Sequence, residues 1–541
     1  MAKGIYDLYL EYADLKEMMN DVAVRFREEP VFKYEKKGIK TEITYERFKN
    51  DIDGFGTYLF SEGFNGDKKI AVLGENSYEW IVTYFSVVNG GNVIIPLDKE
   101  LKPNELLVLL NSSETDVLVY SKHKQKAVDE MVEAGLQVPN LICMDEMDKL
   151  CQDGQEIIAG GNTEYLDVKI DVEKMCAIIY TSGTTGTPKG VMLNQKNLTR
   201  DAYLSISCSK IPRDTVAVLP LNHTFGFMAC ILCQVWMGYC TFITSSLKTF
   251  MRDVKEHKPA HISVVPLFVE SIYKNIWKTA EKSGKAGLLK KLINVSNGMR
   301  KVGIDMRRTL FKTVLDGFGG NLEMIISGGA PIDDIYMKGL EDFGITIING
   351  YGITECSPIV AINRVDSVKY GTVGKAIPTV SVDIRNKNED GEGEVWVKGD
   401  IVMMGYYNNE EATNEVIKDG WFNTGDIGKI VDGEFLGITG RKKNLIILAN
   451  GKNVYPEELE FLVAHIEGVT ECLVYEEDDM IAVEIYSDAE DDREKVKENI
   501  KKGIQELNNS LASYKQIRKI KFRSVEFEKT TTKKIKRSYK N

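Results

Sequence analysis

The chain has 541 residues, which at about 150 residues per domain allows three to four domains. Its 43% hydrophobic and 28% charged residues are ordinary for a globular protein and exclude a collagen-like, disordered or low-complexity chain. The 69 Lys and Arg against 80 Asp and Glu give a net charge of −11, which argues against a protein that coats nucleic acid over its whole surface.

The first part of the chain alternates short apolar runs with helical patterns. We expect strands at residues 69–74, 92–98 and 117–121, with a helix at residues 78–91. The same rhythm returns after residue 175 in the runs CAIIY, TVAVLPL, HISVVP and EMIISGG. Strand, helix and strand in this order predict parallel sheets with crossover helices.

The pattern changes twice toward the C-terminus. A helical, Lys-rich insertion occupies residues 265–324, and short strands with Gly-Asp turns, typical of an all-β piece, begin near residue 371. A compact α+β segment follows residue 441. It has two strands in ECLVYEEDDMIAVEIY around an acidic turn and a charged helix near residues 491–507.

Cysteine usage and the N-terminus both favour a cytoplasmic protein. The nine cysteines are an odd number, and Cys230 and Cys233 form a CxxC without a second pair at zinc-ribbon spacing. Because they lie in an apolar run, we expect buried thiols rather than a metal site. The first twenty residues carry acidic side chains throughout and lack the apolar segment of a signal peptide.

One uncharged stretch is a candidate for membrane contact. Residues 215–247 contain no Asp, Glu, Lys or Arg, and residues 225–243 are long enough to span a bilayer. Gln234, two glycines and polar flanking residues argue against spanning, so we expect a buried core helix. A peripheral membrane contact is the alternative.

The C-terminal end has the opposite charge from the rest of the chain. Residues 515–541 hold eleven Lys or Arg and two Glu, a net charge of +9, so the remainder carries −20. Such a tail is typical of a solvated segment or of one that meets a polyanion.

The segment IIYTSGTTGTPKGV, residues 178–191, carries the strongest local signal. A strand runs into a loop of Gly, Ser and Thr whose backbone N–H groups and hydroxyls suit phosphate oxygens. Lys189 stands between Pro188 and Gly190, so the motif is no Walker A loop, and VMLNQ after it reads as a strand. A P-loop kinase is therefore excluded.

This loop resembles the signature phosphate loop of the AMP-forming acyl-CoA synthetases. That superfamily of adenylating enzymes includes luciferases and nonribosomal peptide adenylation domains. Five further motifs follow in the family's order over nearly the whole chain: SGGAPI, NGYGITE, GWFNTGD, GRKKNLIILANGKNVYPEELE and KTTTKKIKR.

The resemblance implies an α/β fold with two domains. The large N-terminal domain, residues 1–440, would hold the ATP and acyl sites in two parallel-sheet α/β subdomains and a small β-barrel-like subdomain. A small, mobile α+β C-terminal domain, residues 441–541, would rotate about a hinge at Lys443 between two half-reactions.

The same resemblance assigns nucleotide-binding residues, and their side chains suit the roles. Glycines let a planar base lie against the backbone, Tyr351 offers a stacking face, and Asp426 can accept hydrogen bonds from a ribose diol. The adenine and ribose residues are Gly328, Gly329, Ala330, Asn349, Gly350, Tyr351, Gly352, Asp426, Ile438 and Arg441. The phosphate-binding residues are Thr181, Ser182, Gly183, Thr184, Thr185, Gly186, Lys189 and Thr354.

Three residues are expected to carry the chemistry: Lys189, Glu355 and Lys534. Glu355 is the expected Mg²⁺ ligand, since Mg²⁺ bound with substrate phosphates takes one or two carboxylates. Lys534 follows from aligning KTTTKKIKR on the family's TxxGKxxR pattern, in which Lys533 replaces the usual glycine. The structural alternatives are a solvated loop acid for Glu355, a type I turn for Asp426 and a disordered tail for the lysines.

The implied reaction is activation of a carboxylic acid by ATP to acyl-AMP and pyrophosphate, followed by transfer to the thiol of CoA. The loop at residues 448–456 would line the pantetheine tunnel, and His223, Phe225 and Gly451 would gate acyl and CoA entry. His223 has an equal alternative as a hydrogen-bonded histidine at a strand end. The expected partners are a carboxylic acid, ATP and CoA, without nucleic acid.

Several details are similar to long-chain fatty acyl-CoA synthetases in particular. These are the loop ILANG, the helical insertion before SGGAPI and the segment LPLNHTFGF. Two other functions stay open: transfer of the acyl group to a carrier protein, and an acyl-AMP-binding module without turnover.

Overall fold

The computed structural model describes residues 9–181, 188–244, 246–448, 452–489, 493–529 and 535–537. The chain divides into two compact units, which are described separately. Unit 1 comprises residues 1–381 and 397–422, and unit 2 comprises residues 382–396 and 423–541. This division differs from the predicted domains 1–440 and 441–541, whose boundary is defined by a hinge and stays a prediction.

The first sheet of unit 1 has the strand order β18-β8-β7-β4-β3-β5-β6. Strands β3 to β7 run parallel, and β8 and β18 are antiparallel additions at one edge. The apolar runs are buried, as expected for strands covered on both faces. The strands are β3 (Lys69–Leu73), β4 (Val93–Leu97), β5 (Val117–Tyr120), β6 (Asn140–Cys143), β7 (Met175–Thr181), β8 (Lys189–Asn194) and β18 (Gly405–Tyr406).

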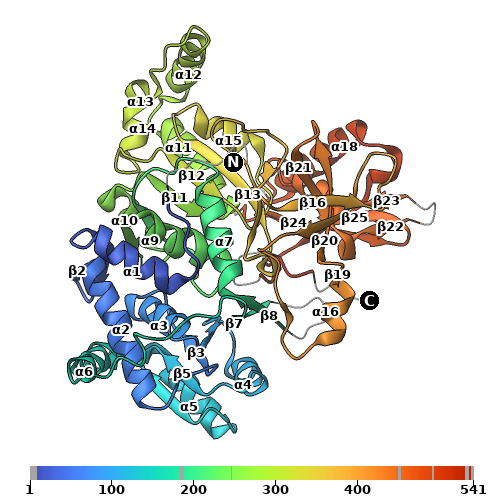
Figure 1. The fold of residues 1–541 in the computed structure, drawn as a ribbon. Helices are drawn as coiled ribbons and strands as arrows, with labels where there is room; N and C mark the ends of the chain where they lie inside the picture. Colours follow the sequence, from blue (N-terminus) through green and yellow to red (C-terminus); the bar gives the residue numbers. More distant parts are fainter. Residues whose placement is uncertain are drawn as a thin grey trace. The chain divides into compact units, whose positions relative to one another are not determined.

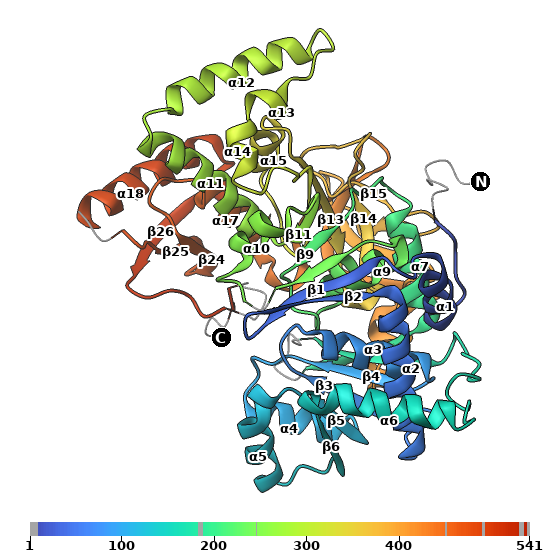
Figure 2. The ribbon, with the colours of Figure 1, turned by 90° about the vertical axis from the view of Figure 1, so that its left-hand side faces the viewer.

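Helices flank this sheet (Figures 1 and 2). Several start with a side-chain cap: Thr44, for example, accepts from the Arg47 N–H and Ser77 from the Trp80 N–H. The helices are α2 (Tyr45–Ser61), α3 (Tyr78–Asn89), α4 (Pro103–Ser112), α5 (Gln125–Glu133), α6 (Met147–Ala159) and α7 (Gln195–Ile206).

The second sheet of unit 1 carries the motifs SGGAPI and NGYGITE. Strands β11, β12 and β13 are parallel, and β14 and β15 continue antiparallel. The predicted helical insertion lies between β11 and β12. The elements are β11 (His261–Val264), α11 (Pro266–Lys282), α12 (Ala286–Arg300), α13 (Arg307–Leu310), α14 (Lys312–Asp316), β12 (Met324–Ser327), α15 (Asp334–Glu341), β13 (Thr346–Gly352), β14 (Ile359–Ile362) and β15 (Lys375–Ala376).

A third sheet of unit 1, in the order β2-β1-β10-β9, is absent from the sequence expectations except for β9. Strand β1 pairs with β10, so that Phe32 lies opposite Thr241. The elements here are α1 (Leu15–Arg25), β1 (Pro30–Lys36), β2 (Ile39–Thr44), β9 (Thr215–Ala217), β10 (Thr241–Ile243) and α10 (Phe250–His257), with α16 (Glu410–Val416) and β19 (Ile417–Lys418) elsewhere in the unit.

The uncharged stretch forms part of the core of unit 1. Helix α8 (Thr224–Phe227), a π-helical turn at Met228–Leu232 and α9 (Cys233–Met237) follow one another, and every residue from 227 to 237 is buried. Cys230 and Cys233 are buried free thiols, as predicted. Gly238, at φ 72°, ends the helix where a Cβ would lie 2.4 Å from the Phe26 ring. In the described part of the chain, no helix combines the length and hydropathy needed to cross a membrane.

Unit 2 contains a small sheet, in which β20 and β21 pair antiparallel, and the C-terminal α+β part. Its sheet order is β21-β20-β17-β16. The predicted acidic hairpin is confirmed: β24 and β25 are antiparallel, and Asp478 and Asp479 take positive φ at its turn. The elements are β16 (Ser381–Arg385), β17 (Gly393–Lys398), β20 (Trp421–Val431), β21 (Phe435–Arg441), β22 (Ile446–Ile447), β23 (Asn453–Val454), α17 (Pro456–Val463), β24 (Glu471–Glu477), β25 (Met480–Tyr486), α18 (Arg493–Ser510) and β26 (Ile517–Arg523).

Together these elements confirm the predicted fold class. Parallel-containing sheets with crossover helices form unit 1, and an α+β part with its own apolar core closes the chain.

Candidate nucleotide site

The predicted phosphate loop connects two paired strands. Strand β7 ends at Thr181 and β8 begins at Lys189, and these two residues lie opposite each other in the antiparallel pair. The Thr181 hydroxyl donates to the Lys189 carbonyl oxygen at 3.4 Å. The strand predicted after Lys189 is confirmed as β8. Ser182, Gly183, Thr184, Thr185 and Gly186 lie outside the described residues.

Lys189 and Glu355 both contact Tyr406, and we call these three residues the phosphate-side cluster. The Lys189 Nζ lies 4.8 Å from the centroid of the Tyr406 ring. The Tyr406 hydroxyl donates to Glu355 Oε1 at 2.9 Å. Glu355 is 8% exposed and Tyr406 7%, so the carboxylate is buried rather than a solvated loop acid. The cluster places a cation and a carboxylate on one aromatic side chain beside the phosphate loop.

Backbone pairing fixes Tyr406 in this position. Strand β18 pairs with β8, so that Tyr406 lies opposite Val191. The Tyr407 N–H donates to the Gly190 carbonyl at 2.7 Å, and the Met403 N–H donates to the Glu355 carbonyl at 2.9 Å. Tyr406 is not predictable from the sequence, because two tyrosines after a glycine carry no specific signal.

The NGYGITE motif turns sharply between β13 and β14. Thr354 and Glu355 lie on a 3-10 turn, Thr354–Cys356, and the Thr354 hydroxyl is 3.3 Å from that of Thr224. A Cβ on Gly352 would lie 2.4 Å from the Pro358 carbonyl oxygen, so this position requires glycine. Gly350 and Tyr351 pair with Ile362 and Ala361 of β14.

Asn349, predicted at the adenine site, uses its amide within the protein. Its Nδ2 donates to the Thr372 carbonyl at 3.0 Å, and its Oδ1 accepts from Asn363 Nδ2 at 2.6 Å. The side chain is buried and ties the middle of β13 to Asn363 and Thr372. A role toward adenine stays a prediction.

The SGGAPI motif brings a predicted gate residue against a predicted adenine residue. Gly328 follows β12 directly, and a Cβ there would lie 3.1 Å from the ring of Phe225. Gly329, at φ 84°, and Ala330 are exposed in the turn. A side chain at position 328 would therefore displace the Phe225 ring.

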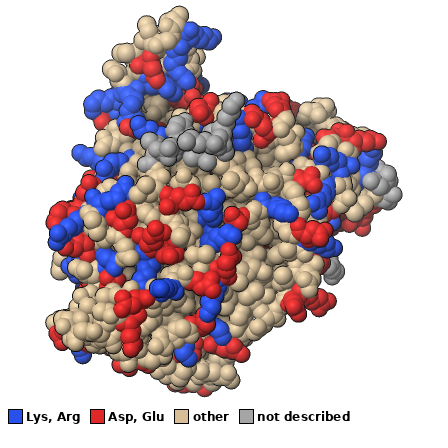
Figure 3. Space-filling view, viewed as in Figure 1, with Lys and Arg blue, Asp and Glu red and all other residues tan. Residues whose placement is uncertain are grey.

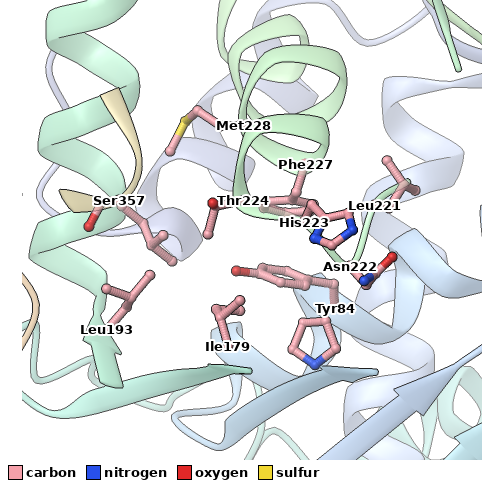
Figure 4. Close-up of a pocket in the computed structure, with 12 residues that line it drawn as sticks. Tyr84, Ile179, Leu193, Leu221, Asn222, His223, Thr224, Phe227, Met228 and Ser357 are labelled. Atoms are coloured by element: carbon pink, nitrogen blue, oxygen red, sulfur yellow. The ribbon is translucent and has the colours of Figure 1, made fainter. Parts of the chain in front are cut away.

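Figure 4 shows a narrow, mainly apolar pocket in unit 1 beside these motifs. The space left between its side chains is on the scale of one water molecule. The rings of Tyr84 and Phe227 stack in it with centroids 3.8 Å apart. His223 lines it from the N-terminal cap of α8 rather than from a strand end. The lining residues are Tyr84, Pro96, Ile179, Leu193, Leu198, Leu221, Asn222, His223, Thr224, Phe227, Met228 and Ser357.

Unit 2 holds the predicted ribose residues as an ion pair, here called the ribose-side cluster. Asp426 and Arg441 lie opposite each other on β20 and β21, with Arg441 Nε 2.8 Å from Asp426 Oδ1. Asp426 is buried in a strand and not in a type I turn. Ile438 pairs with Gly428 on the same two strands.

The predicted hinge residue lies among charges of both signs, with Arg441 and Arg537 on one side of the balance and Glu457 and Asp426 on the other. Lys443 belongs to a 3-10 turn, Lys442–Asn444, directly after β21. Burial lowers the pKa of Lys443, and the nearby charges of Arg441 and Arg537 lower it further. Burial therefore disfavours the charged form of Lys443, the second residue after β21.

The C-terminal lysine motif is tied down at both ends. Lys529 forms an isolated β-bridge with Ile535 and an ion pair with Glu471. Arg537 pairs with Glu460 of α17, and its Nη2 lies 3.6 Å from Glu457 Oε1. We call Arg537, Glu460 and Glu457 the C-terminal anchor. Lys533 and Lys534, like Gly451 in the loop after β22, lie outside the described residues.

The chain is similar in sequence to curated fatty acid ligases. It is 30% identical over 455 residues to the long-chain-fatty-acid–CoA ligase FadD15 of Mycobacterium bovis, covering 78% of this chain and 73% of that protein. Human long-chain-fatty-acid–CoA ligase 1 is 28% identical over 475 residues, covering 80% and 68%.

Solved structures share the fold. The anthranilate CoA ligase AuaEII in complex with anthranoyl-AMP superimposes with a TM-score of 0.78 at 18% identity, covering 98% of this chain and 96% of that one. A Mycobacterium tuberculosis fatty acyl CoA synthetase gives 0.69 at 22% identity, covering 97% of each. The family model described as AMP-binding enzyme matches residues 19–407. Since this match spans most of the chain, the protein belongs to the AMP-binding enzyme family.

Proposed function

We propose that the chain is an AMP-forming acyl-CoA synthetase. In the first step a carboxylate oxygen attacks the α-phosphorus of ATP, and pyrophosphate leaves to give acyl-AMP. In the second, the CoA thiol attacks the acyl carbon, releasing AMP and a proton. The observation that carries the proposal is the phosphate-side cluster, in which Lys189 and Glu355 share Tyr406 beside a Gly/Ser/Thr loop.

The first step needs charge neutralisation rather than a base. A carboxylic acid is already ionised at neutral pH, so no group has to remove its proton. Positive groups held where pyrophosphate departs are commonly the largest contribution to such a reaction. We assign this role to Lys189 and to Lys534.

Mg²⁺ fits the oxygen donors around Glu355. A buried carboxylate and the Thr354 hydroxyl on the same turn are hard ligands, and Mg²⁺ takes one or two carboxylates beside substrate phosphates. Bound there with ATP, it would offset negative charge on the phosphates. The Tyr406 hydroxyl orients the carboxylate by its hydrogen bond to Oε1.

On the nucleoside side, the ribose-side cluster orients two groups for the sugar. Asp426 would accept from the ribose hydroxyls, and Arg441 holds Asp426 by their 2.8 Å contact. Rotation of the C-terminal domain at Lys443 would then remove Lys534 from the active site and bring in the loop at residues 448–456 for the second step.

The proposed substrate is a medium- or long-chain fatty acid, used in the cytoplasm. Two curated relatives are named long-chain-fatty-acid–CoA ligases, and residues 215–247, the candidate floor of an acyl tunnel, contain no charged side chain. An apolar tunnel gains about 0.8 kcal/mol for each methylene it buries. Specificity should therefore rise several-fold per methylene and then level off.

The test measures pyrophosphate release with ATP and Mg²⁺ over acids from acetate to palmitate, with a benzoate and an amino acid as comparisons. Adding CoA or a holo-carrier protein then identifies the acceptor. A flat profile, or an aryl or amino acid as best substrate, would contradict the fatty acid assignment. Acyl-AMP formation without transfer to CoA would favour the carrier protein, and absence of pyrophosphate release would indicate a binding module.

A further inference from the structure

The helical insertion in unit 1 ends in a projecting, basic tip. Figures 1 and 2 both show α12 standing away from the sheets of the unit. We call residues 282–306, which contain α12 and the turn after it, the insertion tip. The insertion tip carries six Lys or Arg and one acid, Asp305, in a chain whose net charge is −11.

Apolar side chains on the insertion tip are exposed in a regular pattern. Leu288 is 56% exposed, Val295 56% and Val302 74%. Leu288 and Val295 are seven residues apart on α12, a spacing that places side chains on one face of a helix two turns apart, and Val302 lies in the turn directly after the helix. Ile304, also exposed, is held at the end of α12 because its N–H donates to the Met299 carbonyl at 3.0 Å.

This exposed face is distinct from the one that packs α12 onto the protein. The packing face is given by Leu289 and Ser296, which are both buried and again seven residues apart. Scattered exposed apolar residues are normal on a protein surface. The fold already uses Leu289 and Ser296 to pack α12. Packing of the fold therefore does not explain a second, exposed apolar face at helical spacing.

Basic side chains accompany the stripe. Lys285, Lys291 and Lys301 are exposed on the same helix and turn, and Figure 3 shows Lys and Arg gathered over this projecting part. Arg300 pairs with Glu341 and so holds the end of α12, whereas Lys285, Lys291 and Lys301 are exposed. A helix with an apolar stripe beside lysines is suited to lie in the interface of an anionic bilayer.

We propose that the insertion tip docks onto the surface of an anionic lipid bilayer. The lysines would meet lipid phosphates while Leu288, Val295 and Val302 enter the acyl boundary. The uncharged stretch at residues 215–247, where the sequence placed a possible membrane contact, is largely buried in the core. The basic charge alone would attract any polyanion. The exposed apolar side chains favour a lipid bilayer over a soluble polyanion.

The test is co-sedimentation of the full chain with vesicles of phosphatidylcholine alone or mixed with phosphatidylglycerol. Binding should require phosphatidylglycerol and weaken with added salt, because exposed charges are screened. Lys291→Glu with Lys301→Glu should lower the partition coefficient by at least about tenfold, since each basic residue contributes near a charged surface. Leu288→Ser with Val295→Ser should weaken binding several-fold.

Matched controls use other exposed residues of unit 1. Lys122→Glu with Lys126→Glu repeats the charge change, and Val108→Ser with Val132→Ser repeats the apolar one. Both should bind vesicles like the parent chain, and circular dichroism melts check that all variants fold. Equal loss in the controls, or binding unaffected by the tip variants, would overturn the proposal.

Two other binding partners of the insertion tip would give different results in this experiment. Dimerisation that is lost in the Leu288→Ser, Val295→Ser variant, without vesicle binding, would assign the stripe to a second copy of the chain. Binding of an oligonucleotide that equals vesicle binding and survives that variant would show a plain polyanion site. Both results would overturn the bilayer. Vesicle binding needs no turnover, so the outcome is independent of the proposed reaction.

Discussion

The two predicted halves of the site hold their cations by different contacts. In the phosphate-side cluster of unit 1, Lys189 lies 4.8 Å from the centre of the Tyr406 ring. In the ribose-side cluster of unit 2, Arg441 lies 2.8 Å from the Asp426 carboxylate, and in the C-terminal anchor Arg537 pairs with Glu460. An aromatic face holds a cation without cancelling its charge, whereas a carboxylate compensates it. We infer from this contrast that Lys189 acts on phosphates and that the arginines of unit 2 fix chain segments.

The largest expected effect tests Lys534, which lies in the sequence between Lys529 and Arg537, two residues that form ion pairs within unit 2. Lys534→Ala should reduce adenylation by about 10²–10³-fold, the usual cost of losing one group that stabilises a transition state. Pyrophosphate release measures this step, and a supplied acyl-adenylate measures thioester formation, which should persist. Lys533→Ala, at the neighbouring position, is the control and should retain most adenylation. Equal loss of both half-reactions in Lys534→Ala would contradict the assignment.

A second prediction tests whether unit 2 has to move. Lys443→Pro fixes φ and removes an N–H at the proposed hinge, so thioester formation should fall by at least about tenfold while adenylation continues. Lys443→Ala removes the side chain but keeps the backbone free, and both half-reactions should continue. Unchanged thioester formation in the proline variant would place the hinge elsewhere.

A third prediction separates the two contacts of Tyr406. Tyr406→Phe keeps the ring beside Lys189 but loses the hydrogen bond to Glu355. Adenylation should fall about tenfold, in line with a hydrogen bond to a charged group, and the Mg²⁺ concentration for half-maximal rate should rise. Tyr406→Ala loses both contacts and should fall further.

The control is Tyr407→Phe, because the Tyr407 hydroxyl contacts the exposed Glu114 at 3.3 Å. Its adenylation rate and Mg²⁺ dependence should match the parent chain. If Tyr406→Phe changed stability but not the Mg²⁺ dependence, Tyr406 would be a packing residue only.

Local patterns in the sequence predicted what depends on neighbours along the chain. The apolar runs predicted the parallel strands, and the family motifs predicted the candidate residues Lys189, Glu355, Asp426 and Arg441. Pairing between distant segments was missed: β1 pairs with β10, and Tyr406 pairs with β8. Asn349 shows the same limit, since its partners Asn363 and Thr372 follow a turn that no periodicity predicts. The uncharged stretch was correctly expected in the core, but Gly238 divides it into helix and strand.

The smallest expected effect concerns the stability of the C-terminal anchor. Burial raises the pKa of Glu460 from its usual 4.5 to about 7, while the Arg537 guanidinium opposes this shift. The folded state therefore keeps a proton that the unfolded state releases between those values. Stability contributed by this group is present below pH 4.5 and is lost as pH rises toward 7.

Glu460→Gln removes that titration and keeps the shape of the side chain. Urea unfolding from about pH 4.5 to about pH 8 should show the parent chain losing stability relative to the variant as pH rises, with the difference levelling off above neutrality. Glu498→Gln, at an exposed position of α18, should follow the parent chain at every pH. Parallel curves for the parent and Glu460→Gln would mean that Arg537 keeps Glu460 ionised throughout. The C-terminal anchor would then be an ion pair at every pH tested. Its carboxylate would compensate Arg537 throughout, in contrast to the aromatic ring that Lys189 contacts in the phosphate-side cluster.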